Sequence, residues 1–288
     1  MIIGSHVQMK APLYFEGAVQ EMLLYKANAL MLYTGAPQNS RRTAVEKMKI
    51  AEGRKLMEEN HIPFERVIVH APYIINTANS VKPEVAELAV SFLHQEIERT
   101  AAMGAKYIVL HPGSYTTTNL ETGIQTVISQ LNKVHVPDTI TICLETMAGK
   151  GTEVGFRFED LATILSKLEQ SDRYGICMDT CHISDAGYDL ADFDAILDEF
   201  DRIIGLDKLH VIHLNDSKNI RGARKDRHEN IGLGTIGFDT LRAVATNTRV
   251  ENVPKILETP FINGFAPYGI EIDMLKSGCF DASRLSIE

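Results

Sequence analysis

The chain has 288 residues, of which 44% are apolar and 23% are charged, proportions that are typical of a folded globular protein. The formal net charge of −9 argues against a protein that holds nucleic acid by bulk positive charge. No apolar run approaches the roughly 20 residues of a membrane span, and the N-terminus "MIIGSHVQMK" lacks the features of a signal peptide. We therefore expect a cytoplasmic protein that is not attached to a membrane.

Short apolar runs alternate with longer helical patterns along the whole chain. The runs are often β-branched, as in strands that are buried on both faces of a sheet. In chain order, the predicted strands are residues 2–7, 29–34, 65–72, 107–113, 140–146, 174–182, 209–216 and 254–260. The predicted helices are residues 16–27, 41–60, 83–103, 124–134, 158–168, 192–204, 238–245 and 267–276.

This alternation predicts a parallel sheet. At this chain length, the most economical closure is a single (β/α)8 TIM barrel over residues 1–288, with its active site at the C-terminal ends of the strands. A doubly wound open sheet is the structural alternative. No G-x-G-x-x-G sequence follows any predicted strand, which argues against a dinucleotide-binding version of that alternative.

The last residues of the predicted strands share one kind of chemistry. An aspartate at the end of an apolar strand is costly unless something there needs it, and Asp179 ends the run "GICMD". In a barrel, such residues point into one shared mouth. Seven of the eight strands end on a His, Asp or Glu, namely His6, His70, His111, Glu145, Asp179, His213 and Glu258.

Converging carboxylates and imidazoles predict a metal cluster, because without cations these groups would repel and desolvate one another. The combination suits zinc and, less specifically, manganese or iron. One zinc ion takes about four ligands, so a single ion cannot use the whole ring.

Further candidate ligands lie close by. His182 follows Asp179 by three residues, and the loop sequence "KDRHEN" places Asp226 and His228 two residues apart, where both side chains can turn to one side. These three residues could hold a metal ion of their own. Counted without His6, the nine candidate ligands would serve three ions if one carboxylate bridges two of them.

The cysteines suggest little chemistry. Cys143 and Cys177 lie inside apolar runs, which predicts buried, unreactive thiols. Cys181 lies beside the candidate ligands, so a ligand role is the alternative for that residue. Cys279 completes the set, and no C-x-x-C pair is present.

The chain contains the motifs "HPGS", "LETMAGKG", "GFRFEDL", "CMDTCHISDAGYDL", "HLNDSK", "DRHENIGLGTIG" and "ILETP". Together these motifs resemble the endonuclease IV family of zinc-dependent apurinic/apyrimidinic endonucleases of base-excision repair. The resemblance runs nearly from end to end. It implies a (β/α)8 fold, three zinc ions, and cleavage of the DNA backbone on the 5′ side of an abasic site, which leaves a 3′-hydroxyl. It also implies removal of 3′-blocking groups.

The resemblance also implies a distribution of ligands. The first ion would take His70, His111 and Glu145, and the second would take Glu145, Asp179, His213 and Glu258. The third ion would take His182, Asp226 and His228. Glu145 would bridge two ions, and Glu145 and Glu258 would be the catalytic carboxylates. His6 is not a ligand in this pattern, and we expect it behind the ligands or at the DNA surface.

Candidate DNA contacts come from three loops. The loop "SKNIRGARKDRH" offers Lys218, Arg221, Arg224, Lys225 and Arg227 for phosphate contacts.

In "HAPYIIN", Tyr73 and Ile74 resemble the residues that the family inserts into the duplex. Gln38 stands about where some members carry an intercalating arginine, and either Arg41 or Arg42 is a candidate substitute.

We therefore expect a monomeric DNA-repair phosphodiesterase that acts on double-stranded DNA containing abasic sites. The main alternative is a divalent-metal-dependent sugar isomerase or epimerase on a related barrel, which needs only one or two ions. The third-ion group and the basic loop favour the nuclease. A non-enzymatic metal-binding protein is less favoured, because the candidate ligands line an open mouth.

Overall fold

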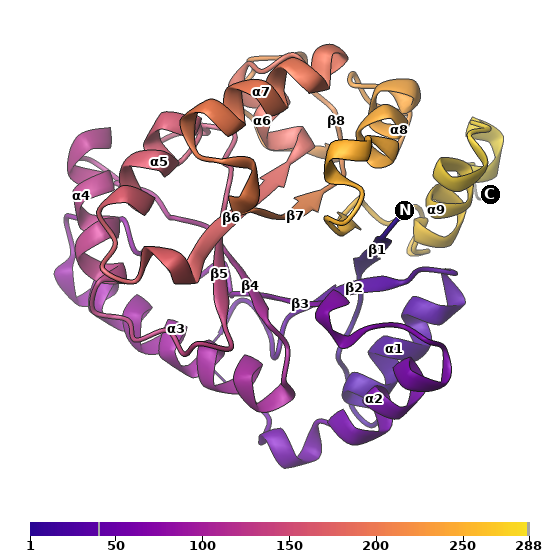
Figure 1. Cartoon of the computed structure of the whole chain (residues 1–288), viewed down its shortest axis with the longest axis horizontal. Helices are drawn as coiled ribbons and strands as arrows, with labels where there is room; N and C mark the ends of the chain where they lie inside the picture. Colours follow the sequence, from indigo (N-terminus) through magenta and orange to yellow (C-terminus); the bar gives the residue numbers. More distant parts are fainter. Residues whose placement is uncertain (40, 287–288) are drawn as a thin grey trace.

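The computed structural model describes residues 1–39 and 41–286; residues 40 and 287–288, which the expected domain includes, lie outside the described residues. Eight parallel strands close into a barrel in the order β1-β10-β7-β6-β5-β4-β3-β2. Helices form a ring around these strands (Figure 1). The predicted (β/α)8 TIM barrel is confirmed, and closure of the sheet rules out the open doubly wound alternative.

The barrel strands are β1 (Ile3–His6), β2 (Ala29–Leu32), β3 (Val67–His70), β4 (Tyr107–Leu110), β5 (Thr141–Glu145), β6 (Tyr174–Asp179), β7 (Leu209–His213) and β10 (Lys255–Leu257). A separate two-stranded sheet pairs β8 (Asp216–Ser217) with β9 (His228–Glu229). The α-helices are α1 (Tyr14–Leu24), α2 (Ile50–Glu59), α3 (Pro83–Met103), α4 (Leu120–Leu131), α5 (Phe158–Ser166), α6 (Thr180–Ala186), α7 (Phe193–Ile203), α8 (Phe238–Thr246) and α9 (Tyr268–Ser277).

Helices α2 and α6 differ most from the sequence prediction. Helix α2 begins at Ile50 rather than at residue 41, because Lys49 adopts a left-handed backbone with φ +53° that a helix cannot continue through. The short helix α6 was not predicted. It begins directly after β6, and the side chain of Asp179 caps it by accepting a hydrogen bond from the backbone N–H of His182 at 2.9 Å.

The barrel interior is apolar beneath the mouth. Gly4 allows β1 to lie close to β2, because a Cβ atom there would sit 1.8 Å from the carbonyl oxygen of Ala29. The side chains packed together inside the barrel are Ala29, Met31, Ile68, Val109, Cys143, Cys177, Val211 and Ile256. The polar strand ends therefore lie directly above close-packed apolar side chains, which limit how far the strand ends can move.

The expected burial of Cys143 and Cys177 is confirmed. Burial raises the pKa of the Cys177 thiol to about 12, so this group is a neutral packing residue near pH 7. None of the helices in the described part of the chain has the length and apolar character that a membrane span requires.

Helix α9 carries a buried carboxylate, that of Glu271. Glu271 accepts hydrogen bonds from the backbone N–H of Ile231 at 2.9 Å, the side chain of Asn230 at 3.1 Å and the hydroxyl of Thr259 at 2.5 Å. Burial raises the pKa of Glu271 from 4.5 to about 7, although these hydrogen bonds oppose the shift. The carboxyl thus ties the C-terminal helix to two loops at the mouth.

We predict that Glu271→Gln removes a pH-dependent loss of stability. A carboxyl whose pKa is raised on folding stabilises the protein fully below about pH 4.5, and this contribution is lost as the pH rises through about 7. Glutamine resembles the protonated acid, so the variant should gain up to ~3 kcal/mol relative to wild type between these pH values. Urea unfolding of both proteins across this range measures the difference. A difference that does not change with pH would contradict this account.

Candidate metal centre

The barrel mouth brings together the nine candidate ligands that the sequence suggested. They form three groups in which the ligand atoms lie within 4.8 Å of one another. The groups are His70, His111 and Glu145; Glu145, Asp179, His213 and Glu258; and His182, Asp226 and His228. Glu145 belongs to two groups, so its carboxylate has the position that a bridging ligand requires.

Glu145, at the end of β5, is the hub of the mouth. Its Oε2 lies 3.2 Å from His70 Nε2 and 3.0 Å from His111 Nε2. Its Oε1 lies 3.2 Å from both His182 Nδ1 and His213 Nδ1. A single buried carboxylate therefore faces four imidazoles that come from four different segments of the chain.

The second group joins three neighbouring strands. His213 Nδ1, at the end of β7, lies 2.9 Å from Glu258 Oε2 and 3.8 Å from Asp179 Oδ2. Glu258 follows β10 by one residue, and Asp179 ends β6. Since β6, β7 and β10 are adjacent in the barrel, parallel strand ends are enough to bring these side chains together.

The third group depends on a loop. His182 comes from α6, and its Nε2 lies 3.1 Å from Asp226 Oδ1. His228 Nε2 lies 3.8 Å from the same oxygen and 3.6 Å from Asp179 Oδ2. Asp226 and His228 lie on the long connection between β7 and α8, so this group depends on how that loop is held.

Backbone carbonyls orient three of the imidazoles. The Nδ1 atoms of His70, His182 and His228 lie 2.7, 2.8 and 3.2 Å from the carbonyl oxygens of Ala71, Thr146 and Glu258, respectively. A carbonyl only accepts, so each Nδ1 carries the hydrogen and each Nε2 is left to face the cluster. Fixing a ring nitrogen in this way is the usual support for a metal-binding histidine.

Ionisation is strongly coupled across the mouth. Burial by itself would raise the pKa of the Glu145 carboxyl, but His213 and His111 outweigh it and hold that pKa well below its usual range. Burial would lower the pKa of His182, yet the carboxylates of Asp179 and Asp226 raise it well above the ordinary value. Protons on the imidazoles thus balance carboxylate charge where bound cations could do the same.

Asn215 was not identified from the sequence, although it lies in the quoted motif "HLNDSK". Its side-chain nitrogen donates to Asp179 Oδ2 at 2.8 Å, and its side-chain oxygen accepts from the backbone N–H of Glu258 at 2.8 Å. It therefore links the ends of β6 and β10 from its place after β7. An uncharged amide gives no metal signal in a sequence, which is why residue chemistry alone missed it.

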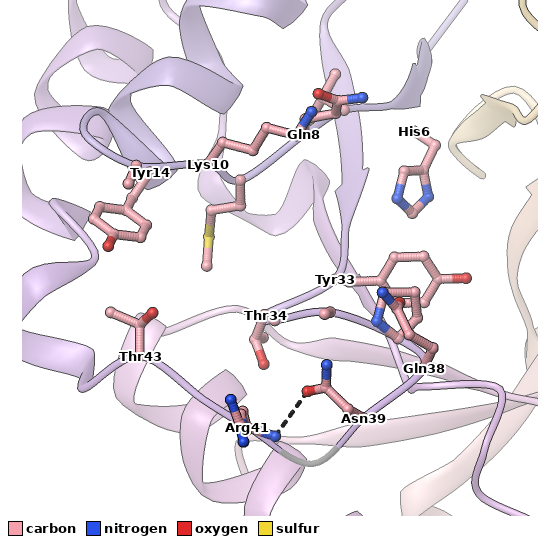
Figure 2. Close-up of a pocket in the computed structure, with 16 residues that line it drawn as sticks. His6, Gln8, Lys10, Tyr14, Tyr33, Thr34, Gln38, Asn39, Arg41 and Thr43 are labelled. Carbon is pink, nitrogen blue, oxygen red and sulfur yellow. Dashed lines mark hydrogen bonds between the residues drawn. The ribbon is translucent and has the colours of Figure 1, made fainter.

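A cavity of about 630 Å³ opens beside the cluster. Figure 2 shows that its walls come from the segments after β1 and after β2, with Gln38, Asn39 and Arg41 on one side and Lys10 and Tyr14 on another.

The rings of His6, Tyr33 and His70 lie where the cavity meets the candidate ligands. The ring of Tyr33 lies 4.7 Å from that of His6 and 5.3 Å from that of His70, measured between centroids. His6 Nδ1 lies 3.8 Å from Glu258 Oε1. His6 therefore separates the cavity from the second group of candidate ligands.

Arg42 cannot replace an intercalating arginine in this conformation. Its Nε donates to Glu96 Oε1 at 2.6 Å, its Nη1 donates to the carbonyl oxygen of Asn39 at 2.8 Å, and its side chain is only 5% exposed. The guanidinium is therefore used to anchor the loop onto α3. Arg41 and Gln38 are accessible at the cavity, so a ligand there can reach both side chains.

The other predicted DNA-contacting residues are accessible. Tyr73 is 56% exposed and Ile74 is half-buried, both just after β3. In the loop after β7, the cationic side chains that solvent reaches are Lys218, Arg221, Arg224, Lys225 and Arg227.

Four of these cations already have partners within the protein. Lys218 Nζ lies 3.9 Å from Glu229 Oε2, and Arg227 Nη1 donates to the carbonyl oxygen of Asp226 at 3.1 Å. Arg221 pairs with the exposed Asp189, and the guanidinium of Arg224 lies 4.9 Å from the ring centroid of Phe156. Both interactions are at the surface, where ion pairs are weak and partners can be exchanged.

Fold and site together define a xylose isomerase-like TIM barrel with a mouth rich in histidine and carboxylate. Residues 21–277 match the protein family of that description. A crystal structure of D-tagatose 3-epimerase-like protein shares the fold, with a TM-score of 0.70 and 17% identity over 96% of each chain.

Relatives with higher sequence identity show which family within this class the chain belongs to. "Probable endonuclease 4" of Bacillus thuringiensis (strain Al Hakam) is 52% identical over 291 residues, covering 98% of this chain and 97% of the relative. The crystal structure of endonuclease IV from Thermus thermophilus superposes with a TM-score of 0.83 at 29% identity, covering 97% of this chain and 100% of that one. The chain belongs to the endonuclease IV family. The resemblance seen in the sequence is therefore confirmed, as is the expected hydrolase class.

Metal binding at this mouth should stabilise the fold and release protons. A ligand that binds only the folded state at 100 times its dissociation constant adds about 2.7 kcal/mol to stability. The raised pKa values of His182 and His213 mean that both carry protons near neutral pH, and binding must displace them. Adding Zn²⁺ to chelator-treated protein should therefore raise Tm and acidify a weakly buffered solution. Glu145→Gln should reduce both effects; acidification that is undiminished in this variant would contradict the role of the hub.

Proposed function

We propose that this protein is a zinc-dependent phosphodiesterase that cleaves DNA on the 5′ side of abasic sites, leaves a 3′-hydroxyl and removes 3′-blocking groups. The observation that carries the proposal is the three-group arrangement of nine imidazole and carboxylate ligands around Glu145, on a chain of the endonuclease IV family. Multi-ion sites of this kind suit phosphate ester cleavage.

The donor set fits zinc. Imidazole and carboxylate are ligands that zinc binds readily, with manganese or iron as alternatives at some positions. The Nε2 of His228 is buried and has no hydrogen-bond partner among the described residues, although it lies beside two carboxylates. Such an atom is costly unless a cation occupies its free side. Each of the three groups would hold one ion, with Glu145 bridging two of them.

When bound, the ions would supply a nucleophile from water near neutral pH and neutralise charge on the phosphoryl oxygens. The protein's own groups provide orientation. The carboxylate of Glu258 belongs to the second group and lies between His6 and His213. It is therefore placed to accept a proton from an attacking water. Glu145 stays ionised because four imidazoles surround it.

Local cations would hold the DNA despite the net charge of −9. The accessible basic side chains after β7 border the third group, where they can contact phosphates on either side of the scissile bond. Tyr73 and Ile74 present aromatic and aliphatic surface after β3, and Gln38 and Arg41 border the cavity after β2. Together these loops would contact a bent duplex on several sides of the barrel mouth.

A sugar epimerase remains the second candidate, since solved epimerases share the fold. The third group of ligands and the basic loop favour the nuclease, because an epimerase of this barrel type needs only one or two ions. Incubation with a ketose and with an abasic duplex in parallel separates the two activities.

Purified protein should incise a duplex with one abasic site and leave a 3′-hydroxyl and a 5′-deoxyribose phosphate, as resolved by gel electrophoresis and mass spectrometry. Glu258→Gln should slow incision by roughly 10²–10⁴-fold while leaving duplex binding largely intact, because it removes the proton acceptor. Glu251→Gln, at an exposed position after α8, is the control. The proposal fails if the zinc-loaded protein leaves the abasic duplex uncut, and the role of Glu258 fails if the variant cuts at the wild-type rate.

Replacing Tyr73 and Ile74 with alanine should reduce lesion discrimination more than chemistry. Opening a base stack costs a few kcal/mol, least where a base is already missing, and an inserted side chain recovers part of that cost by stacking. The ratio of affinities for abasic and intact duplexes, measured at one salt concentration, should fall. Incision of a short single-stranded abasic substrate should persist.

The control replaces Leu24 and Leu88, exposed apolar residues on α1 and α3, with alanine. An unchanged affinity ratio in the Tyr73 and Ile74 variant would assign lesion reading to another loop.

A further inference from the structure

The segment that carries Asp226 has an unfavourable backbone. Arg224 and Asp226 adopt φ values of +53° and +54°, in the left-handed region that residues other than glycine rarely enter. Such conformations persist only where the surroundings hold them. The carboxylate of Asp226 is therefore presented to His182 by a strained turn that needs an anchor.

Asp185 is that anchor. Its side chain is fully buried on α6, and its Oδ2 accepts hydrogen bonds from the backbone N–H of Asp226 at 2.8 Å and of Lys225 at 3.1 Å. Its carbonyl oxygen accepts from the N–H of Arg224 at 3.0 Å. Both left-handed residues thus donate their N–H groups to Asp185. The remaining oxygen, Oδ1, accepts from the hydroxyl of Ser217 at 2.7 Å, in β8 of the same connection.

Helix α6 therefore supplies both a member of the third group and the residue that holds another member in place. His182 is a member of the group, and Asp185 lies three residues later, nearly one helical turn along. His182 Nε2 lies 3.1 Å from the carboxylate of Asp226, whose own backbone N–H is held by Asp185. One short helix fixes the relative position of two members of the group, although Asp226 is 44 residues away from His182 in the sequence.

We propose that Asp185 is a positioning residue that sets the affinity of the His182, Asp226 and His228 group for its divalent ion. Asp185 acts through the loop backbone and does not itself face the ion. The role is geometric, since it depends on acceptors for two N–H groups. Asparagine can preserve it, because its amide oxygen accepts those bonds and its NH₂ can donate to the Ser217 oxygen. This inference rests on the metal centre of the proposed function but not on DNA cleavage.

The test counts ions in the free protein, without DNA. Wild type, Asp185→Ala and Asp185→Asn are equilibrated in buffers of fixed free Zn²⁺ and examined by native mass spectrometry. Asp185→Ala should retain two ions and bind the third roughly 10–100-fold more weakly, as is usual when a partner of a metal ligand is removed. Asp185→Asn should stay close to wild type. Titration with Co²⁺ should show, by visible absorption, that the weakened site is the one containing Asp226.

Thr235→Val is the matched control. The Thr235 hydroxyl ties the same loop to the carbonyl oxygens of Ser217 and Asn219 without touching Asp226, so this variant loosens the loop elsewhere. It should retain the third ion. The two ions at the strand ends show in every variant that the barrel is folded.

Four outcomes would overturn the inference. Asp185→Ala could keep the third ion with wild-type affinity, or Thr235→Val could lose it equally. Asp185→Asn could lose as much affinity as Asp185→Ala, which would assign the effect to charge. Finally, wild type could hold fewer than three ions, which would also refute the proposed metal centre. Failure to cut abasic DNA, by contrast, would refute the proposed function and leave the role of Asp185 intact.

Discussion

The buried carboxylate of Glu145 is the constraint on which the mouth of this barrel depends. Four imidazoles lie within 3.2 Å of its two oxygens, and burial alone would make a charge there very costly. The charge survives because imidazoles from β3, α6, β7 and the residue after β4 converge on it. That convergence requires a closed barrel whose strands end at the same level. The ionised state of Glu145 therefore depends on the fold.

The three ligand groups differ in how the protein supports them. The first two come from strand ends or from the residues directly after them, above the packed interior of the barrel. The third takes two of its members from the connection between β7 and α8, which has only the short strands β8 and β9 as regular structure. Strand ends are held by the ladder and by core packing, whereas the loop is held by buried polar contacts.

Buried carboxylates that accept backbone hydrogen bonds are a recurring device around that connection. Asp185 and Glu271 hold its backbone from α6 and α9. Asp216 accepts from the backbone N–H groups of Ser217, Gly232, Gly234, Ile236 and Gly237. Backbone N–H groups can stabilise a buried carboxylate and order an irregular loop at the same time.

The amino-acid sequence by itself determined the alternation of strands and helices, the closed barrel and the chemistry of the mouth. Strands buried on both faces leave a continuous apolar signal, and a charged residue at the end of such a strand is too costly to keep without a partner. For that reason His70, His111, Glu145, Asp179 and Glu258 could be named as candidate ligands before any geometry was known.

Only the tertiary structure decided which side chains support or block the site. The pattern of residues 41–60 predicted one helix, but the left-handed Lys49 delays α2 to Ile50, and Glu96 sequesters Arg42 from the mouth. The roles of Asn215 and Asp185 depend on hydrogen bonds to residues more than 30 positions away in the chain. Hydrogen bonds of this kind are set by the packing of distant segments, and neither periodicity nor residue type records them.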